Sequence, residues 1–251
     1  MKQALLALAT GLAATEVAVA EGPVKEDGRW RSSLGAAYSE ARGNSESLNL
    51  ALQADAVRAT PQDKWTAAVR ALYARTDGST TSDQLRAATR YDWNLTPRSF
   101  VFGGLELERD EVALLDLRAS VSTGAGYKLV DDAALTWAVF GGVGYTGDRY
   151  AEPRLVDDAL RGSYEYANLL VGQESTHRFS DTTSGRQRLA LYPNLRNSGE
   201  YRADWDIGLA VAMTKSWNIT AGFTWRYNSD PGPALRSTDT LLTTGVSVKF
   251  D

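Results

Sequence analysis

The chain has 251 residues, of which 43% are hydrophobic, 23% charged and 10% aromatic, and this composition excludes an intrinsically disordered protein. The formal net charge of -4 argues against a nucleic-acid binder, because such proteins need a basic face. The lack of Cys excludes a disulfide framework, a thiol nucleophile and a Cys-ligated zinc site.

The first twenty residues have the features of a secretory signal peptide. Lys2 precedes the apolar run ALLALATGLAA, and residues 18–20 form an A-x-A cleavage pattern. The run is shorter than the roughly 20 apolar residues that a transmembrane helix needs. We therefore expect a cleaved signal peptide at 1–20, a short periplasmic segment at 21–28 and one folded domain at 29–251.

Beyond residue 28, apolar and polar residues alternate with a period of two, which is typical of strands. In the segment 201–213, for example, Trp205 and Ile207 lie on one face while Arg202 and Asp204 lie on the other. The pattern predicts twelve strands, at residues 30–41, 47–58, 64–75, 83–95, 100–109, 115–129, 134–146, 162–175, 184–192, 200–213, 217–228 and 238–250.

The phase of one of these strands, at 162–175, is left open. Tyr164 and Tyr166 are offset from Leu169 and Val171, so either pair could face inward.

Strand length separates two all-β folds. Strands of a soluble β-sandwich average about 5–6 residues, whereas these segments are about as long as tilted bilayer-crossing strands. Short connections such as ATPQDK and TPRS alternate with longer ones such as 76–82 and 147–161. We therefore predict a transmembrane antiparallel up-and-down β-barrel of about 12 strands, with both termini in the periplasm.

The aromatic residues support this interpretation, because they gather near the strand ends. Amphipathic rings at the two membrane interfaces of a barrel form two girdles. The sequence predicts a periplasmic girdle of Trp30, Trp65, Trp93, Trp137 and Trp217, and an outer girdle of Tyr38, Tyr73, Tyr145, Tyr201 and Tyr227.

The opposite face of the strands is rich in charges, which we expect inside the barrel. Opposed acidic and basic groups there could filter ions in a water-filled pore or, if paired across a narrow lumen, could plug it. The candidate lumenal charges are Arg70, Arg86, Arg90, Glu106, Glu108, Arg118, Arg202, Asp204, Asp206 and Arg226.

Two segments resemble a known family. RGNSESLNL at 42–50 and the stretch from YPNLRNSGEYRADWD to VSVKF at 192–250 resemble the YdiY-like salt-induced outer membrane proteins. The resemblance implies an outer membrane barrel and, through the family name, a link to salt or osmotic stress. One departure is that Asp251 follows the terminal aromatic Phe250, which such barrels usually place last.

Three other patterns suggest chemistry. Gly142, Gly144 and Gly147 match a dinucleotide fingerprint, but they lie in a strand with no helix, so we interpret them as small wall residues. His177 is the single His; we expect an exposed turn residue with no serine on its face. The pairs Asp204–Asp206 and Glu106–Glu108 could bind a cation, but the many inward Arg residues favour ion pairs.

These observations predict a narrow passive channel for ions or small polar solutes in the outer membrane of a Gram-negative bacterium. The alternative is a non-conducting envelope protein that binds through its loops, above all 147–161. A membrane-embedded hydrolase is the third hypothesis, and we expect no enzymatic activity. We expect a monomer without cofactor or metal. Its partners would be outer membrane lipid, lipopolysaccharide and, during biogenesis, the barrel assembly machinery.

Overall fold

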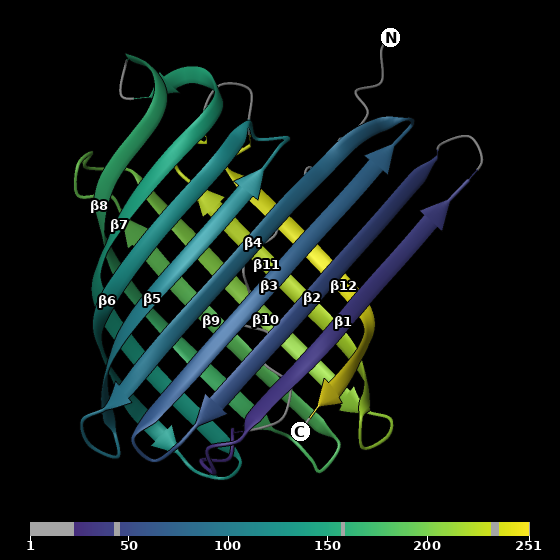
Figure 1. Cartoon of the computed structure of the whole chain (residues 1–251), viewed down its shortest axis with the longest axis vertical. Helices are drawn as coiled ribbons and strands as arrows, with labels where there is room; N and C mark the ends of the chain where they lie inside the picture. The colour runs from purple at the N-terminus through teal and green to yellow at the C-terminus, as the bar shows by residue number, and fades with distance from the viewer. Residues whose placement is uncertain (1–22, 43–45, 157–158, 232–235, 251) are drawn as a thin grey trace.

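A computed structural model describes residues 23–42, 46–156, 159–231 and 236–250. Within these ranges the chain forms twelve antiparallel strands that close into one up-and-down barrel (Figure 1). No helix in these ranges is long and apolar enough to cross a membrane. The strands are β1 Trp30–Ala41, β2 Ser47–Ala59, β3 Asp63–Thr76, β4 Ser79–Asn94, β5 Ser99–Asp110, β6 Leu115–Asp131, β7 Leu135–Val156, β8 Ala159–Arg178, β9 Thr183–Pro193, β10 Tyr201–Ala212, β11 Trp217–Asn228 and β12 Thr238–Phe250.

The structure confirms the predicted all-β fold and strand order. Each strand pairs with its chain neighbours, and β12 returns to pair with β1. The expected signal peptide lies outside the described residues, and the periplasmic location of the termini stays a prediction.

The outer surface of the barrel is apolar. Alternate residues of every strand point away from the lumen, and most of these side chains are hydrophobic. Leu34 is 56% exposed, Val121 53% and Ile219 51%, and similar side chains continue around the wall. In water such a surface would be unfavourable, whereas a bilayer covers it. All ten expected girdle residues lie on this outer face; Trp30 packs against Trp65, and Tyr201 stacks on Tyr227.

Two loop predictions, at 147–161 and at 76–82, are wrong. The stretch 147–161 is mostly strand, because β7 continues to Val156 and β8 begins at Ala159 (Figure 1). Leu115, Tyr150, Val156, Tyr164 and Tyr166 pack together there and stabilise the extension.

The expected loop at 76–82 is only a tight turn, since β4 begins at Ser79. Asp77 and Gly78 have φ angles of 49° and 81°, as a type I′ hairpin turn requires. The Asp-Gly pair that favours this turn was present in the sequence.

The structure also resolves the phase of β8. Tyr164 and Tyr166 are buried inside, at 5% and 8% exposure, whereas Leu169 and Val171 face outward at 40% and 55%. The two tyrosines therefore belong to the lumen, not to the girdle.

Candidate functional site: the charged lumen

The structure places all ten candidate charges on the inner faces of β3, β4, β5, β6, β10 and β11. Arg70 and Asp206 are 3% exposed, Arg86 is 6% and Glu108 is 8%. Because they come from strands on opposite sides of the barrel, these side chains can meet across the lumen as well as along the wall. Seven of the ten form clusters at three levels, whereas Arg70 pairs with Asp55 of β2 and Arg202 and Asp206 belong to none of the three clusters.

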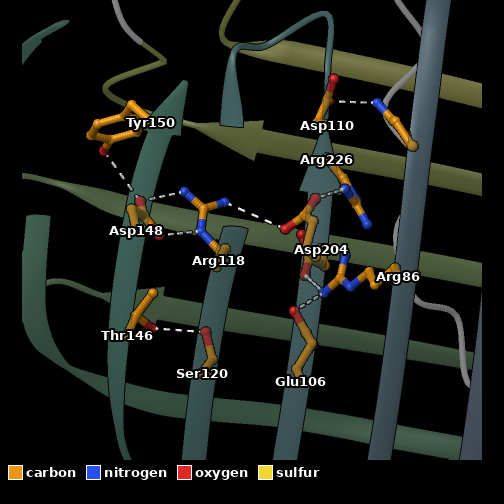
Figure 2. A network of polar contacts seen from close by, with 12 residues as sticks. Arg86, Glu106, Asp110, Arg118, Ser120, Thr146, Asp148, Tyr150, Asp204 and Arg226 are labelled. Atoms are coloured by element: carbon orange, nitrogen blue, oxygen red, sulfur yellow. Dashed lines mark hydrogen bonds and ion pairs between the residues drawn. The ribbon is translucent and has the colours of Figure 1, made fainter. Parts of the chain in front are cut away.

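The cluster nearest the Tyr-girdle end of the barrel is centred on Arg118 of β6 (Figure 2). Its guanidinium donates two hydrogen bonds of 2.7 Å to the carboxylate of Asp148 and lies 3.5 Å from Glu108. Glu108 also pairs at 3.1 Å with Arg226 of β11, a strand that is not a neighbour of β5. The Tyr150 hydroxyl donates to Asp148 at 3.3 Å. This cluster therefore ties β5, β6 and β7 to the opposite wall.

A second cluster crosses the lumen at mid-height. Arg86 of β4 forms an ion pair with Glu106 of β5 and lies 4.0 Å from Asp204 of β10 (Figure 2). One guanidinium thus faces two carboxylates from opposite walls. Neutralising Arg86 would leave the carboxylates of Glu106 and Asp204 facing each other without a positive charge between them.

The third cluster lies toward the Trp girdle. Arg90 pairs with Asp92 at 2.7 Å and with Glu174 of β8 at 3.2 Å. Its guanidinium also lies over the rings of Phe102 and Phe140, at 4.4 and 5.1 Å from their centroids. Cation–π contact with these rings holds Arg90 against an apolar part of the lumen.

The apolar region of the lumen beside Arg90 was not predicted from the sequence. Phe100, Phe102, Phe140 and Leu170 form a buried cluster inside the barrel with Ala138 and Ala190. The rings of Phe100, Phe102 and Phe140 each lie over a glycine of the neighbouring strand: Gly126, Gly124 and Gly172, respectively. Phe100 and Phe102 lie an even number of positions before Glu106 in β5, so strand alternation predicts that both rings point inward as Glu106 does.

Asp148 is a second omission, because the sequence analysis assigned it to a loop. Thr146, Asp148 and Tyr150 are all buried on alternate positions of β7, so extending the predicted strand by four residues would have placed Asp148 inside. Tyr192 is a third omission; it packs against the phenylalanine cluster and accepts hydrogen bonds from Arg188.

Two lumenal cavities lie on either side of the network. The first has a volume of about 80 Å³ and is lined by β1, β2 and β10–β12 together with Arg70 and Arg186. The second, of about 90 Å³, is bounded by the charged residues Arg86, Arg90, Glu106, Arg188, Arg202 and Asp204. Arg202 also lines a smaller space of about 40 Å³ beside Arg118 and Tyr150. The lumen is therefore narrowed by ion pairs but not filled.

The segment before β1 lies against the periplasmic-girdle end of the lumen. Asp27 accepts hydrogen bonds from Arg31, which is buried on the inner face of β1, and Glu26 lies 3.9 Å from Lys128 of β6. The bonds from Arg31 and from the backbone N–H of Arg29 lower the pKa of Asp27 to about 2. This carboxylate stays ionised at neutral pH and keeps the segment at the lumen.

The expectation that His177 is a turn residue without a serine beside it is wrong. His177 lies in β8, and its Nε2 is 3.0 Å from the hydroxyl of Ser175, which is two residues earlier on the same outer face. Phe179 stacks on the imidazole at 5.5 Å. Among the described residues no carboxylate is hydrogen-bonded to His177, so the third group of a hydrolytic triad is missing there.

The glycines that match the dinucleotide fingerprint allow close packing of β7 against β6. Gly142 and Gly144 lie in β7, and a Cβ on Gly142 would collide with the backbone of Thr123 and Gly124 in β6. No helix follows, so the phosphate-binding arrangement is not formed. Within the described ranges, no group of three or more acidic or His residues could hold a metal ion.

Comparisons with known proteins place these features in a family. A family model described as "Protein of unknown function, DUF481" matches residues 34–250, which confirms the resemblance to the YdiY-like proteins. A search of curated proteins found no match.

Several solved barrels share the general shape. The NanC porin is 12% identical, with a TM-score of 0.47, over 87% of this chain and 97% of that one. The KdgM porin is 10% identical, with a TM-score of 0.44, over 89% and 100% of the two chains. The translocator domain of autotransporter NalP from Neisseria meningitidis is 12% identical, with a TM-score of 0.46, over 88% and 87%. Similarity at this level says nothing about a solute.

Proposed function

Because the chain belongs to the family described as "Protein of unknown function, DUF481", we propose its function from the lumen itself. The protein acts as a narrow passive channel for ions and small polar solutes in the outer membrane of a Gram-negative bacterium. The observation that carries this proposal is the first cavity, whose lining contains no residue of the three charged clusters.

The lining of that cavity favours anions. Its charged side chains among the described residues are Arg70 and Arg186, and the rest are small, hydroxyl, amide or aliphatic residues. The pairing of Arg70 with Asp55 reduces its net effect, and no carboxylate lies among the described residues of this lining. We expect a modest preference for anions over cations.

The outer surface and the family resemblance support the location. Outer membrane lipid and lipopolysaccharide would cover the apolar band between the two girdles, and the barrel assembly machinery would insert the chain. The barrel would act as a monomer and without catalysis. A role in salt or osmotic stress rests on the resemblance to the YdiY-like proteins, and loss of fitness of a deletion strain at high salt would test it.

Single-channel recording tests the proposal. Residues 21–251 are refolded and inserted in a planar bilayer under a salt gradient. Discrete, reproducible conductance steps with an anion-selective reversal potential are expected. Silence from protein that is heat-modifiable on gels, and therefore folded, would refute the channel.

A non-conducting binding protein is the second candidate, and one observation favours it. The β7–β8 hairpin extends past the ends of neighbouring strands (Figure 1), and its inner side carries the cluster of Tyr150, Tyr164 and Tyr166. Removal of the hairpin end at 151–161 would then abolish binding of a ligand while leaving the barrel folded.

A further inference from the structure

Polar side chains interrupt the apolar outer wall on β8 and β9. Gln173, Ser175 and His177 alternate along β8, and Gln187 of β9 lies opposite Ser175. On its other side Ser175 pairs with Trp137, which is 40% exposed, so these side chains belong to the outer face of the sheet. We call Gln173, Ser175, His177 and Gln187 the β8–β9 patch.

The patch extends from the Trp girdle into the apolar band. His177 lies beside the last residue of β8, at the girdle end, whereas Gln173 lies further from that end. Gln187 pairs with Ile207, in the middle of β10. The two glutamines therefore lie just inside the Trp girdle, where the wall is otherwise apolar.

Each glutamine is held by a tryptophan. The indole Nε1–H of Trp137 donates to Oε1 of Gln173 at 3.1 Å, and that of Trp205 donates to Oε1 of Gln187 at 3.4 Å. An indole N–H is a donor only, so the amide oxygen must face it and the amide NH₂ group must point elsewhere. Within the described ranges neither NH₂ group has an acceptor, and neither nitrogen is buried. Both groups therefore reach the surface with their donors unused.

Two outward hydroxyls elsewhere on the wall are satisfied by the barrel itself. The hydroxyl of Thr89 donates to the carbonyl oxygen of Thr66 at 3.0 Å. The hydroxyl of Thr123 donates to the carbonyl oxygen of Phe102 at 2.9 Å. Lipid chains offer no acceptor to an amide N–H, and an unpaired donor in hydrocarbon is unfavourable. The two glutamines thus need acceptors that the wall does not supply.

The ester carbonyls of a glycerophospholipid meet this need. They accept hydrogen bonds without donating any, and they lie just inside the head groups, at the level where Trp rings gather. With the esters at the two amides, the acyl chains lie along the apolar wall and the head group lies toward His177. The Nε2 of His177 is 3.0 Å from the hydroxyl of Ser175, and its Nδ1 makes no hydrogen bond within the described residues. The imidazole can therefore contact the head group.

We propose that the β8–β9 patch binds one glycerophospholipid of the periplasmic leaflet, whose ester carbonyls accept hydrogen bonds from the amide NH₂ groups of Gln173 and Gln187. The inference goes beyond the proposed channel function. It shares with that function only the location in the membrane.

Native mass spectrometry of the refolded protein with two lipids tests the site. One lipid is a phosphatidylethanolamine with ester-linked chains, and the other is its ether-linked analogue with the same head group and chain length, which lacks the carbonyl acceptors. The parent should retain the ester lipid on the order of tenfold more strongly, because the ether lipid cannot accept the two hydrogen bonds. In Gln173→Leu/Gln187→Leu this preference should disappear. Equal retention of the two lipids by the parent would overturn the proposal.

The matched control is Thr89→Val/Thr123→Val, which also removes two polar groups from the outer face. Since the wall satisfies these hydroxyls, the control should keep the ester preference. Loss of the preference in the control as well would overturn the site on β8 and β9. If the double glutamine variant is not heat-modifiable, the single variants Gln173→Leu and Gln187→Leu are measured, and an unchanged preference in both would contradict the proposal.

Other occupants of the patch give different results. A dimer of the parent that Gln173→Leu/Gln187→Leu dissociates would mean that a second copy covers the amides, and this would overturn the lipid site. Bound lipopolysaccharide that the same variant loses would also overturn it, because that lipid belongs to the outer leaflet. An ester preference in a protein that does not conduct would refute the channel and support the lipid site.

Discussion

The two cavities of the lumen differ in what lines them. The cavity beside β3–β10 is lined by four arginines and two carboxylates, and the phenylalanine cluster adjoins it at Leu170. The cavity beside β10–β12, β1 and β2 is lined by small residues such as Gly35, Gly208 and Gly222. Two of the three charged clusters border the second cavity, and none of the three contributes a residue to the lining of the first. A barrel of twelve strands can therefore be narrowed without being sealed.

The largest effect should come from filling the first cavity. A Cβ on Gly208 would meet only Cγ of Arg186, at 4.0 Å, so a larger side chain fits there at the cost of the passage. Gly208→Trp should reduce single-channel conductance severely while the protein stays heat-modifiable. Gly103→Trp is the matched control, because Gly103 lies on the outer face with nothing within 4 Å of its Cβ position. Equal conductance in the two variants would contradict this comparison.

An intermediate effect should come from the charged side. Arg86→Gln leaves Glu106 and Asp204 without their shared guanidinium. Removing one partner of a buried ion pair costs about 3 kcal/mol, and the freed carboxylates should shift the reversal potential toward cations. Urea unfolding and bilayer recording measure the two effects. In the double variant Arg86→Gln/Glu106→Gln, both the loss of stability and the shift of the reversal potential should be smaller than in Arg86→Gln. If the effects of the two substitutions simply add, the two residues are not coupled.

The smallest effect should come from a turn outside the lumen. The carboxylate of Asp132 accepts hydrogen bonds of 2.8 Å from the backbone N–H groups of Ala134 and Leu135, and these bonds lower its pKa below 3.8. The ionised carboxylate of Asp132 stabilises the fold fully above pH 3.8, and this stabilisation is lost as the pH falls through the lowered pKa. Asp132→Ala should slightly lower the temperature of heat modification at pH 7 without changing conductance. The difference from the parent should vanish in strong acid, and a constant difference would exclude the ionised carboxylate as its cause.

Much of the barrel could be predicted because one face of every strand meets lipid. A period of two then assigns each residue to the inside or the outside, as for Arg86 and Trp65. The extension of β7 beyond Tyr150 could not be read in this way, because the register shift between Arg149 and Arg154 breaks the alternation.

Which lumenal side chains contact each other could not be predicted from the sequence, for a different reason. Alternation places Glu108 and Arg226 inside, but their meeting across the barrel depends on the register of all the strands between them. Local pattern determines which way a side chain points, whereas closure of the sheet determines what it meets.

The central claim is that solutes pass along the small-residue side of the lumen. Thr220→Cys places a thiol in the first cavity and Ser122→Cys places one in the second, in a chain without native Cys. Single channels of each variant are recorded before and after addition of a charged thiol reagent. The structure predicts a strong block for Thr220→Cys and little change for Ser122→Cys. An equal block in both, or a block for Ser122→Cys alone, would contradict the claim.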